Sequence, residues 1–218
     1  MSAPLAVFDL DGTITRRDTL WPYLTGFLRH HPGRLPRLLL ATPTVLAFLL
    51  GRGDRGALKG ALIHHVLGGL RGAEILAWSE LFVPQLVKNG LFAEALAAIA
   101  EQRGRGAYLV LLSASVDLYV PLVGKSLGFD EIISSRVLWE TDGRLNGRLD
   151  GPNCRGAEKV RQLQQLLEHR RPSGSAAYGN SDADLLHMAL VEEGIYVNGT
   201  RAGKLPANIR RVSWFHRA

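Results

Sequence analysis

Two aspartates separated by one residue follow a short apolar run near the start of the chain. Residues 4 to 9 predict a buried strand, and they lead into Asp9-Leu10-Asp11-Gly12-Thr13. Side chains two residues apart on a strand share a face, so both carboxylates converge at the strand's carboxyl end. Two close carboxylates repel each other, and a divalent cation such as Mg²⁺ relieves that repulsion. The pattern therefore favours a metal-assisted site over an ordinary strand end followed by a glycine turn.

Within the same motif, Gly12 allows a tight turn and Thr13 offers a hydroxyl and an amide to an anion. Three later segments carry compatible chemistry. Ser113 ends a second apolar strand, Lys159 lies in the first turn of a helix after Cys154, and Tyr178-Gly-Asn-Ser-Asp-Ala-Asp184 follows a third strand. Each alone has a structural explanation, namely a turn serine, a surface lysine and a helix cap. All three lie at strand ends or helix starts, where an open α/β sheet binds ligands, and together they favour one site.

The elements that must position these residues alternate along the chain. Short apolar runs alternate with helical periodicity after position 88, which predicts an α/β fold with a doubly wound parallel sheet. Ile132–Trp139 and Leu145–Leu149 flank a turn and predict a hairpin. Residues 17–87 show helical signals and few strand signals. We expect a helical cap over 17–87, inserted after the first strand, and an α/β core from 1–16 and 88–218. The predicted cap helices cover 19–30, 35–50, 55–66 and 73–87, and the predicted core helices cover 92–102, 116–127, 158–170 and 182–192.

Charge is concentrated in the same region. Nine Lys or Arg and two acids between positions 16 and 71 give +7, whereas the whole chain carries +6. The run 38–51 has no charged residue, yet it is too short to span a bilayer. We expect it to be a packed cap helix. The alternative is an interfacial helix on an anionic membrane, since basic residues flank the run. These are Arg34, Arg37, Arg52, Arg55 and Lys59.

At these motifs the chain resembles the haloacid dehalogenase-like hydrolase superfamily, and within it the phosphoserine-phosphatase-like subfamily with a small helical cap. The resemblance rests on Phe8-Asp-Leu-Asp-Gly-Thr13, Asn153-Cys-Arg-Gly-Ala-Glu-Lys159 and Tyr178-Gly-Asn-Ser181. It implies that Asp9 is a nucleophile forming an aspartyl-phosphate, and that Asp11 is the general acid and base. It also implies that Ser113 and Lys159 hold the phosphoryl group.

The resemblance further implies a Mg²⁺ held by the Asp9 carboxylate, the Asp11 carbonyl and a side chain of the fourth motif. Asp184 would orient Lys159 or a water on the metal. This chain has Asn180 where the family most often has an aspartate, and Asp182 could supply the missing charge. Asp18, at the start of the cap, is either a substrate contact or the cap of the following helix.

We expect a Mg²⁺-dependent phosphomonoester hydrolase, since a halide leaving group needs neither a general acid nor a metal. Three alternatives stay open: a lipid-phosphate phosphatase at a membrane surface, phosphoryl transfer to an alcohol, and an anion-sensing module without catalysis. The expected partner is a small phosphorylated metabolite or a lipid phosphate. Trp214-Phe215-His216-Arg217 is an isolated basic and aromatic cluster, so we expect no nucleic acid. A single cysteine and the absence of a visible export signal predict a cytoplasmic protein.

Overall fold

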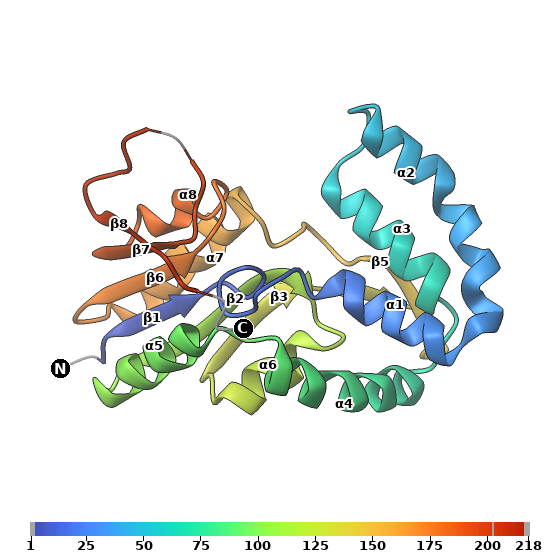
Figure 1. The fold of residues 1–218 in the computed structure, drawn as a ribbon, viewed down its shortest axis with the longest axis horizontal. Coiled ribbons are helices and arrows are strands. Elements are labelled where there is room, and N and C mark those ends of the chain that lie inside the picture. The colour runs from blue at the N-terminus through green and yellow to red at the C-terminus, as the bar shows by residue number, and fades with distance from the viewer. Residues whose placement is uncertain (1–2, 202, 216–218) are drawn as a thin grey trace.

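A six-stranded parallel sheet forms the centre of the computed structural model, which describes residues 3–201 and 203–215. His216 and Arg217 therefore lie outside the described residues. The strand order is β3-β2-β1-β6-β7-β8, with β1 in the interior between β2 and β6 (Figure 1). The doubly wound α/β fold is thus confirmed. The strands are β1 (Leu5–Phe8), β2 (Tyr108–Val116), β3 (Glu131–Ser135), β6 (Ser175–Gly179), β7 (Glu193–Val197) and β8 (Ile209–Val212).

Successive side chains of the interior strands pack alternately into two separate hydrophobic cores, one on each face of the sheet. Ala6 and Phe8 face the core that includes α5 and α6, while Leu5 and Val7 face the core that includes α7 and α8. A strand buried on both faces reads as a continuous apolar run, as β1 and β2 do. The helices of the core are α5 (Ala93–Gly104), α6 (Val120–Leu127), α7 (Ala157–Arg170) and α8 (Leu185–Met188).

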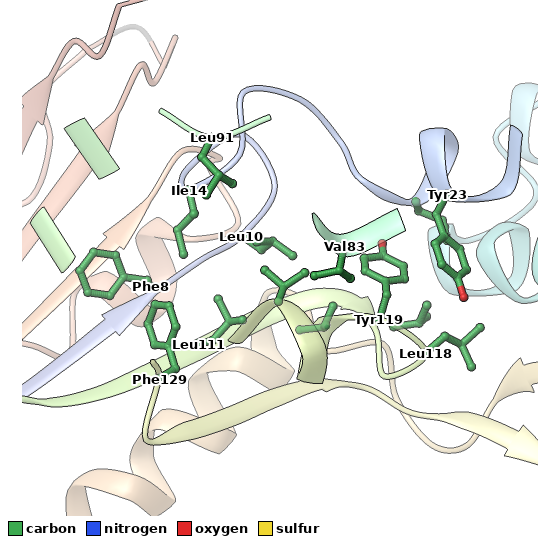
Figure 2. Close-up of a cluster of buried hydrophobic side chains, with 14 of the residues drawn as sticks. Phe8, Leu10, Ile14, Tyr23, Val83, Leu91, Leu111, Leu118, Tyr119 and Phe129 are labelled. Atoms are coloured by element: carbon green, nitrogen blue, oxygen red, sulfur yellow. The ribbon is translucent and has the colours of Figure 1, made fainter. Parts of the chain in front are cut away.

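The segment 17–87 is helical and leaves the sheet at the carboxyl end of β1. Its helices are α1 (Leu20–His30), the 3-10 helix η1 (Pro32–Ala41), α2 (Thr42–Leu49), α3 (Arg55–Leu67) and α4 (Gly72–Asn89). One apolar cluster joins this segment to the sheet. Figure 2 shows it running from Phe8 and Leu111 past Leu10 to Tyr119 and Tyr23. The cap is therefore packed against the core through shared apolar side chains.

Four elements differ from the sequence-based expectation. The helix expected over 182–192 is only the short α8 (Leu185–Met188). The run 132–139 is divided: β3 joins the parallel sheet, and after Ser135 the chain turns and β4 (Val137–Trp139) pairs antiparallel with β5 (Leu145–Leu149). No Gly or Pro marks the break, so periodicity alone could not place it. The expected helix over 35–50 is η1 followed by α2. Pro36, inside η1, lacks the N–H that a continuous α-helix would use. The strand β8 was not expected, because its two arginines give it little apolar pattern.

The β4–β5 hairpin lies beside the cap. Its Leu145 exchanges backbone hydrogen bonds with Leu70 and Gly69, each 2.8 Å long. Gly147, with a φ of +88°, lies against the backbone of His64 on α3, where a Cβ would come within 2.7 Å. The hairpin, which belongs to the core part of the chain, therefore packs against α3 of the cap. Among the described residues, none of the helices is long and apolar enough to cross a membrane.

Candidate active site

A cavity of about 710 Å³ lies where the carboxyl ends of the central strands meet the cap. Asp9 and Asp11 follow β1, Ser115 comes from β2 and Asn180 follows β6. Helices α1 and α3 supply the opposite wall with apolar and cationic side chains. The cavity-lining motif residues therefore meet at the sheet edge that the sequence indicated, and the cap lies opposite them.

Asp9 and Asp184 share one buried lysine on the floor of this cavity. The Lys159 Nζ donates to Asp9 Oδ1 at 2.6 Å and to Asp184 Oδ1 at 2.7 Å, and all three side chains are buried. The Thr13 hydroxyl donates to the other oxygen of Asp9 at 3.0 Å. Asp184 is held in turn by the amide and hydroxyl of Ser181, at 3.0 and 2.6 Å. Both oxygens of Asp9 are thereby fixed in position.

Burial shapes the protonation of this group. Loss of hydration raises the pKa of Asp9 to about 7, while the Lys159 charge works in the opposite direction and the Asp184 charge adds to the rise. The two carboxylates hold the pKa of Lys159 above its usual range, against the effect of its burial. When Asp9 is ionised, the single ammonium of Lys159 faces two carboxylates, and this group of three side chains then carries a net negative charge.

Asp11 has a different environment, next to the start of the cap. Its Oδ1 accepts from the Thr19 amide at 2.8 Å and the Thr19 hydroxyl at 2.7 Å, and its Oδ2 accepts from the Ser115 hydroxyl at 2.5 Å. The Tyr119 hydroxyl contacts that of Thr19 at 2.9 Å. Burial, together with the charge of Asp18, raises the pKa of Asp11. A raised pKa and a fixed position both suit a carboxyl group that acts as a general acid.

The fourth motif separates the two residues that could complete a metal site. Asn180 lines the cavity and lies so close to Gly12 that a Cβ there would come within 2.0 Å of the Asn180 Nδ2. Gly12 has a φ of +79°, so glycine is needed for both the turn and the contact. Asp182 instead accepts from the Tyr196 hydroxyl at 2.9 Å and lines a different hollow. The geometry favours Asn180 over Asp182 as the cavity ligand.

Two residues expected to contact substrate lie deeper than the cavity surface. Thr13 and Ser113 are both fully buried, and neither lines the cavity. Thr13 acts on Asp9 instead, and the Ser113 hydroxyl accepts from the Ser115 amide at 3.0 Å. Asp18 accepts from the Trp21 amide at 3.1 Å at the start of α1, as expected of a capping residue, and it also lines the cavity.

Lys59 is a site residue that the sequence analysis misplaced among the surface charges. It projects from α3 into the cavity, where its Nζ donates to the Ala114 carbonyl and, at 2.8 Å, to Asn153 Oδ1. Burial lowers the pKa of Lys59 to about 8. Its inward position was not predictable, because the sequence does not show which face of α3 lies against the cavity. Arg55, Arg155 and Arg16 also line the cavity.

The donor set fits a hard divalent cation. Asp9 and Asp184 supply two buried carboxylates, and among the described residues Lys159 is the buried lysine in contact with both. Asp11 and Asn180 line the same cavity, so oxygen ligands of the kind that Mg²⁺ prefers are available there. Among the described residues, no group of three or more His, Cys, Asp or Glu is arranged to hold a metal ion by itself, so a cation here would also need backbone carbonyl and amide oxygens.

Two relatives cover most of the chain. Protein CicA of Caulobacter vibrioides is 35% identical over 197 residues, which is 87% of this chain and 83% of CicA. The probable phosphatase Rv3661 of Mycobacterium tuberculosis is 25% identical over 214 residues, or 94% of this chain and 72% of the relative.

Solved structures share the fold. A protein of unknown function from Bordetella pertussis Tohama I superposes with a TM-score of 0.77 at 20% identity, over 92% of each chain. The probable phosphoserine phosphatase of Vibrio cholerae gives 0.68 at 16% identity, over 91% of this chain and 57% of that one. The family model for haloacid dehalogenase-like hydrolase matches residues 6–189. The chain therefore belongs to the haloacid dehalogenase-like hydrolases and is a hydrolytic enzyme.

Proposed function

We propose that this enzyme is a Mg²⁺-dependent phosphomonoester hydrolase that works through an aspartyl-phosphate on Asp9. The observation that carries the proposal is the pairing of two aspartates with different hydrogen-bond partners. Asp9 is fixed by Lys159 and Thr13, whereas Asp11, two residues later, is partly buried and bonded to the hydroxyl groups of Thr19 and Ser115. Two titratable groups whose surroundings separate their roles are typical of acid–base and nucleophilic catalysis.

In the first step, an Asp9 oxygen attacks phosphorus as the ester P–O bond breaks. Asp11 gives its proton to the departing alkoxide, and the raised pKa of Asp11 supports this role. In the second step, Asp11 takes a proton from water, which attacks the phosphorus and releases inorganic phosphate and free Asp9. Lys159 stabilises charge on the phosphoryl oxygens.

A bound Mg²⁺ would neutralise charge on the phosphoryl group during both steps. Asp9, the Asp11 carbonyl and Asn180 are the residues that we assign to it. Two observations support this assignment. Lys159 is shared by two aspartates, so it cannot balance both when they are ionised, and Asn180 packs closely on Gly12. Asp184 has the role of positioning Lys159, to which it is bonded at 2.7 Å.

The cavity wall opposite the aspartates indicates the substrate class. Lys59, Arg55 and Arg155 supply positive charge, while Leu20 and Leu62 supply apolar surface. We propose a small phosphorylated metabolite whose organic part contacts the cap. Asp18 would contact that organic part from the start of α1. The single, buried Cys154 agrees with a reducing compartment, and we propose that the enzyme acts in the cytoplasm.

The test is phosphate release from a panel of phosphomonoesters, with Mg²⁺ and with a chelator. We expect turnover that needs Mg²⁺ and is lost in Asp9→Asn. An added alcohol that lowers phosphate yield while ester consumption continues would identify phosphoryl transfer instead. Binding of these esters without turnover of any would replace the enzymatic proposal by an anion sensor.

A further inference from the structure

The outer edge of the cap carries a ridge of exposed leucines, which we call the leucine ridge: Leu39, Leu40, Leu46, Leu49 and Leu50. They come from the end of η1, from α2 and from the residue that follows α2, and Figure 1 draws α2 well away from the sheet. Leu39 is 73% exposed, Leu49 72% and Leu50 67%. Leu46, Leu49 and Leu50 are spaced i, i+3 and i+4, so they share one face of the helix.

This ridge has no partner within the described chain. Helix α2 contains no buried residue, although its sequence Thr-Pro-Thr-Val-Leu-Ala-Phe-Leu has no charged side chain. Isolated exposed leucines are ordinary on a protein surface, but a contiguous set on one helix marks an interaction surface. A packed cap helix, which the sequence analysis expected here, would bury these side chains. The structure buries only Ala41 of η1 and α2.

The charge near the ridge is mostly positive. Between positions 19 and 73 the sequence has seven Lys or Arg and one acid, Asp54. That acid is already engaged, because it accepts from the amides of Gly56 and Ala57 at the start of α3. Arg29, Arg52 and Arg55 are exposed. A partner of this surface must therefore be apolar where it meets the leucines and anionic around them.

We propose that the leucine ridge docks the enzyme on an anionic membrane surface. An interfacial helix inserts its apolar side chains among the headgroups while basic residues beside it attract acidic lipids. A second copy of this chain fits less well, because a symmetric contact would bring identical basic rims together. This inference goes beyond the proposed phosphatase activity and does not depend on the identity of the substrate.

The ridge is continuous in sequence with the cavity. Leu50 and Arg52 precede α3, whose Arg55 and Lys59 line the cavity from the cap side. Docking through the ridge would thus hold the cap wall of the active site next to the bilayer. Lys59 itself cannot contribute to docking, since it donates inward to Ala114 and Asn153.

The experiment is sedimentation of the full chain with vesicles of phosphatidylcholine alone or mixed with phosphatidylglycerol. We expect binding to the mixed vesicles, weakened by added salt because exposed charges are screened. Leu49→Gln with Leu50→Gln should lower the partition more than tenfold, and Arg52→Gln should lower it about fivefold. The controls are Leu81→Gln with Leu186→Gln, at exposed leucines elsewhere, and Lys125→Gln, at an exposed lysine of α6.

Hydrolysis of a small soluble phosphomonoester by these variants is measured in parallel, and it should stay at the wild-type rate. Thermal unfolding verifies that each variant is folded. No sedimentation with anionic vesicles at low salt would overturn the proposal. So would equal loss of binding in the control variants, or equal binding to phosphatidylcholine alone. A dimer in sedimentation equilibrium that Leu49→Gln with Leu50→Gln dissociates would assign the ridge to a second copy instead.

Discussion

At the scale of single residues, the site depends on how one lysine is shared. Lys159 is bonded to Asp9 and Asp184 within 2.7 Å, so neither carboxylate can be altered without changing the charge balance of the other. The sequence allowed these residues to be named, because each follows a strand or begins a helix. It could not show that Thr13 would hold Asp9 rather than meet an anion, since that depends on the close turn at Gly12.

Exchange of Asn180 tests the metal assignment. Asn180→Asp adds a carboxylate to the cavity, so the Mg²⁺ concentration for half-maximal activity should fall several-fold, because hard cations are held largely by charge. The turnover rate should fall as well, since the added charge repels the incoming phosphate. The measurement is a Mg²⁺ titration of phosphate release.

Asp182→Ala is the matched comparison for that titration. Its side chain is bonded to Tyr196 outside the cavity, so its removal should leave the midpoint unchanged. If Asp182→Ala shifts the midpoint and Asn180→Asp does not, the assignment of Asn180 is wrong.

At the scale of elements, strand ends and turns position the chemistry. The sequence predicted β1, β2, β6 and β7 because buried parallel strands read as apolar runs. It failed at the break between β3 and β4, where the chain changes its partner strand and no Gly or Pro marks the change. It also failed at η1, where the helical spacing of leucines gave no sign that they would face solvent. Burial is decided by neighbouring elements, which a local pattern does not contain.

The turn after β1 gives a prediction at this scale. Gly12→Ala should displace Asn180, because the new Cβ would come within 2.0 Å of the Asn180 amide. We expect a loss of at least tenfold in activity and a higher Mg²⁺ midpoint. The left-handed backbone should also lower the free energy of unfolding by about 1–2 kcal/mol. Activity and denaturant unfolding are measured together.

Gly143→Ala provides the control for this strain. Gly143 has a φ of +78°, nearly that of Gly12, yet no atom lies within 4 Å of its Cβ position. A similar loss of stability with normal activity is expected there. If Gly12→Ala behaves in the same way, contact with Asn180 does not position the fourth motif.

At the scale of the whole molecule, the cap and the core meet through polar contacts around the cavity. Thr19, at the start of α1, holds Asp11, and Lys59 of α3 donates to the Ala114 carbonyl in β2. The insertion of a helical segment was readable from composition, since strand signals are few over 17–87. The sequence did not show which side chains would join this segment to the core, because basic residues that face inward and outward look alike in sequence.

Lys59 gives a pH-dependent prediction. Burial lowers its pKa to about 8, so its charge is present below pH 8 and is lost as the pH rises above it. If that charge attracts the anionic substrate, kcat/KM should fall through an alkaline limb near pH 8. Lys59→Arg should move the limb to higher pH, because a guanidinium stays protonated. Lys59→Met should lower kcat/KM about tenfold at neutral pH.

The control for this profile is Lys125→Arg, on an exposed position of α6 far from the cavity lining. It should reproduce the wild-type limb. An alkaline limb that is unchanged in Lys59→Arg would show that another group causes it, and Lys59 would then be a structural contact between cap and core.

Covalent phosphorylation of Asp9 is the central claim, and an acid quench during turnover tests it most directly. With a ³²P-labelled ester, wild-type protein should carry label on the peptide that contains Asp9. Asp11→Asn is measured alongside, because loss of the base for the second step should make its label persist after the substrate is removed. Asp9→Asn should carry no label although it remains folded. Label on Asp9→Asn, or turnover of that variant at the wild-type rate, would contradict the mechanism.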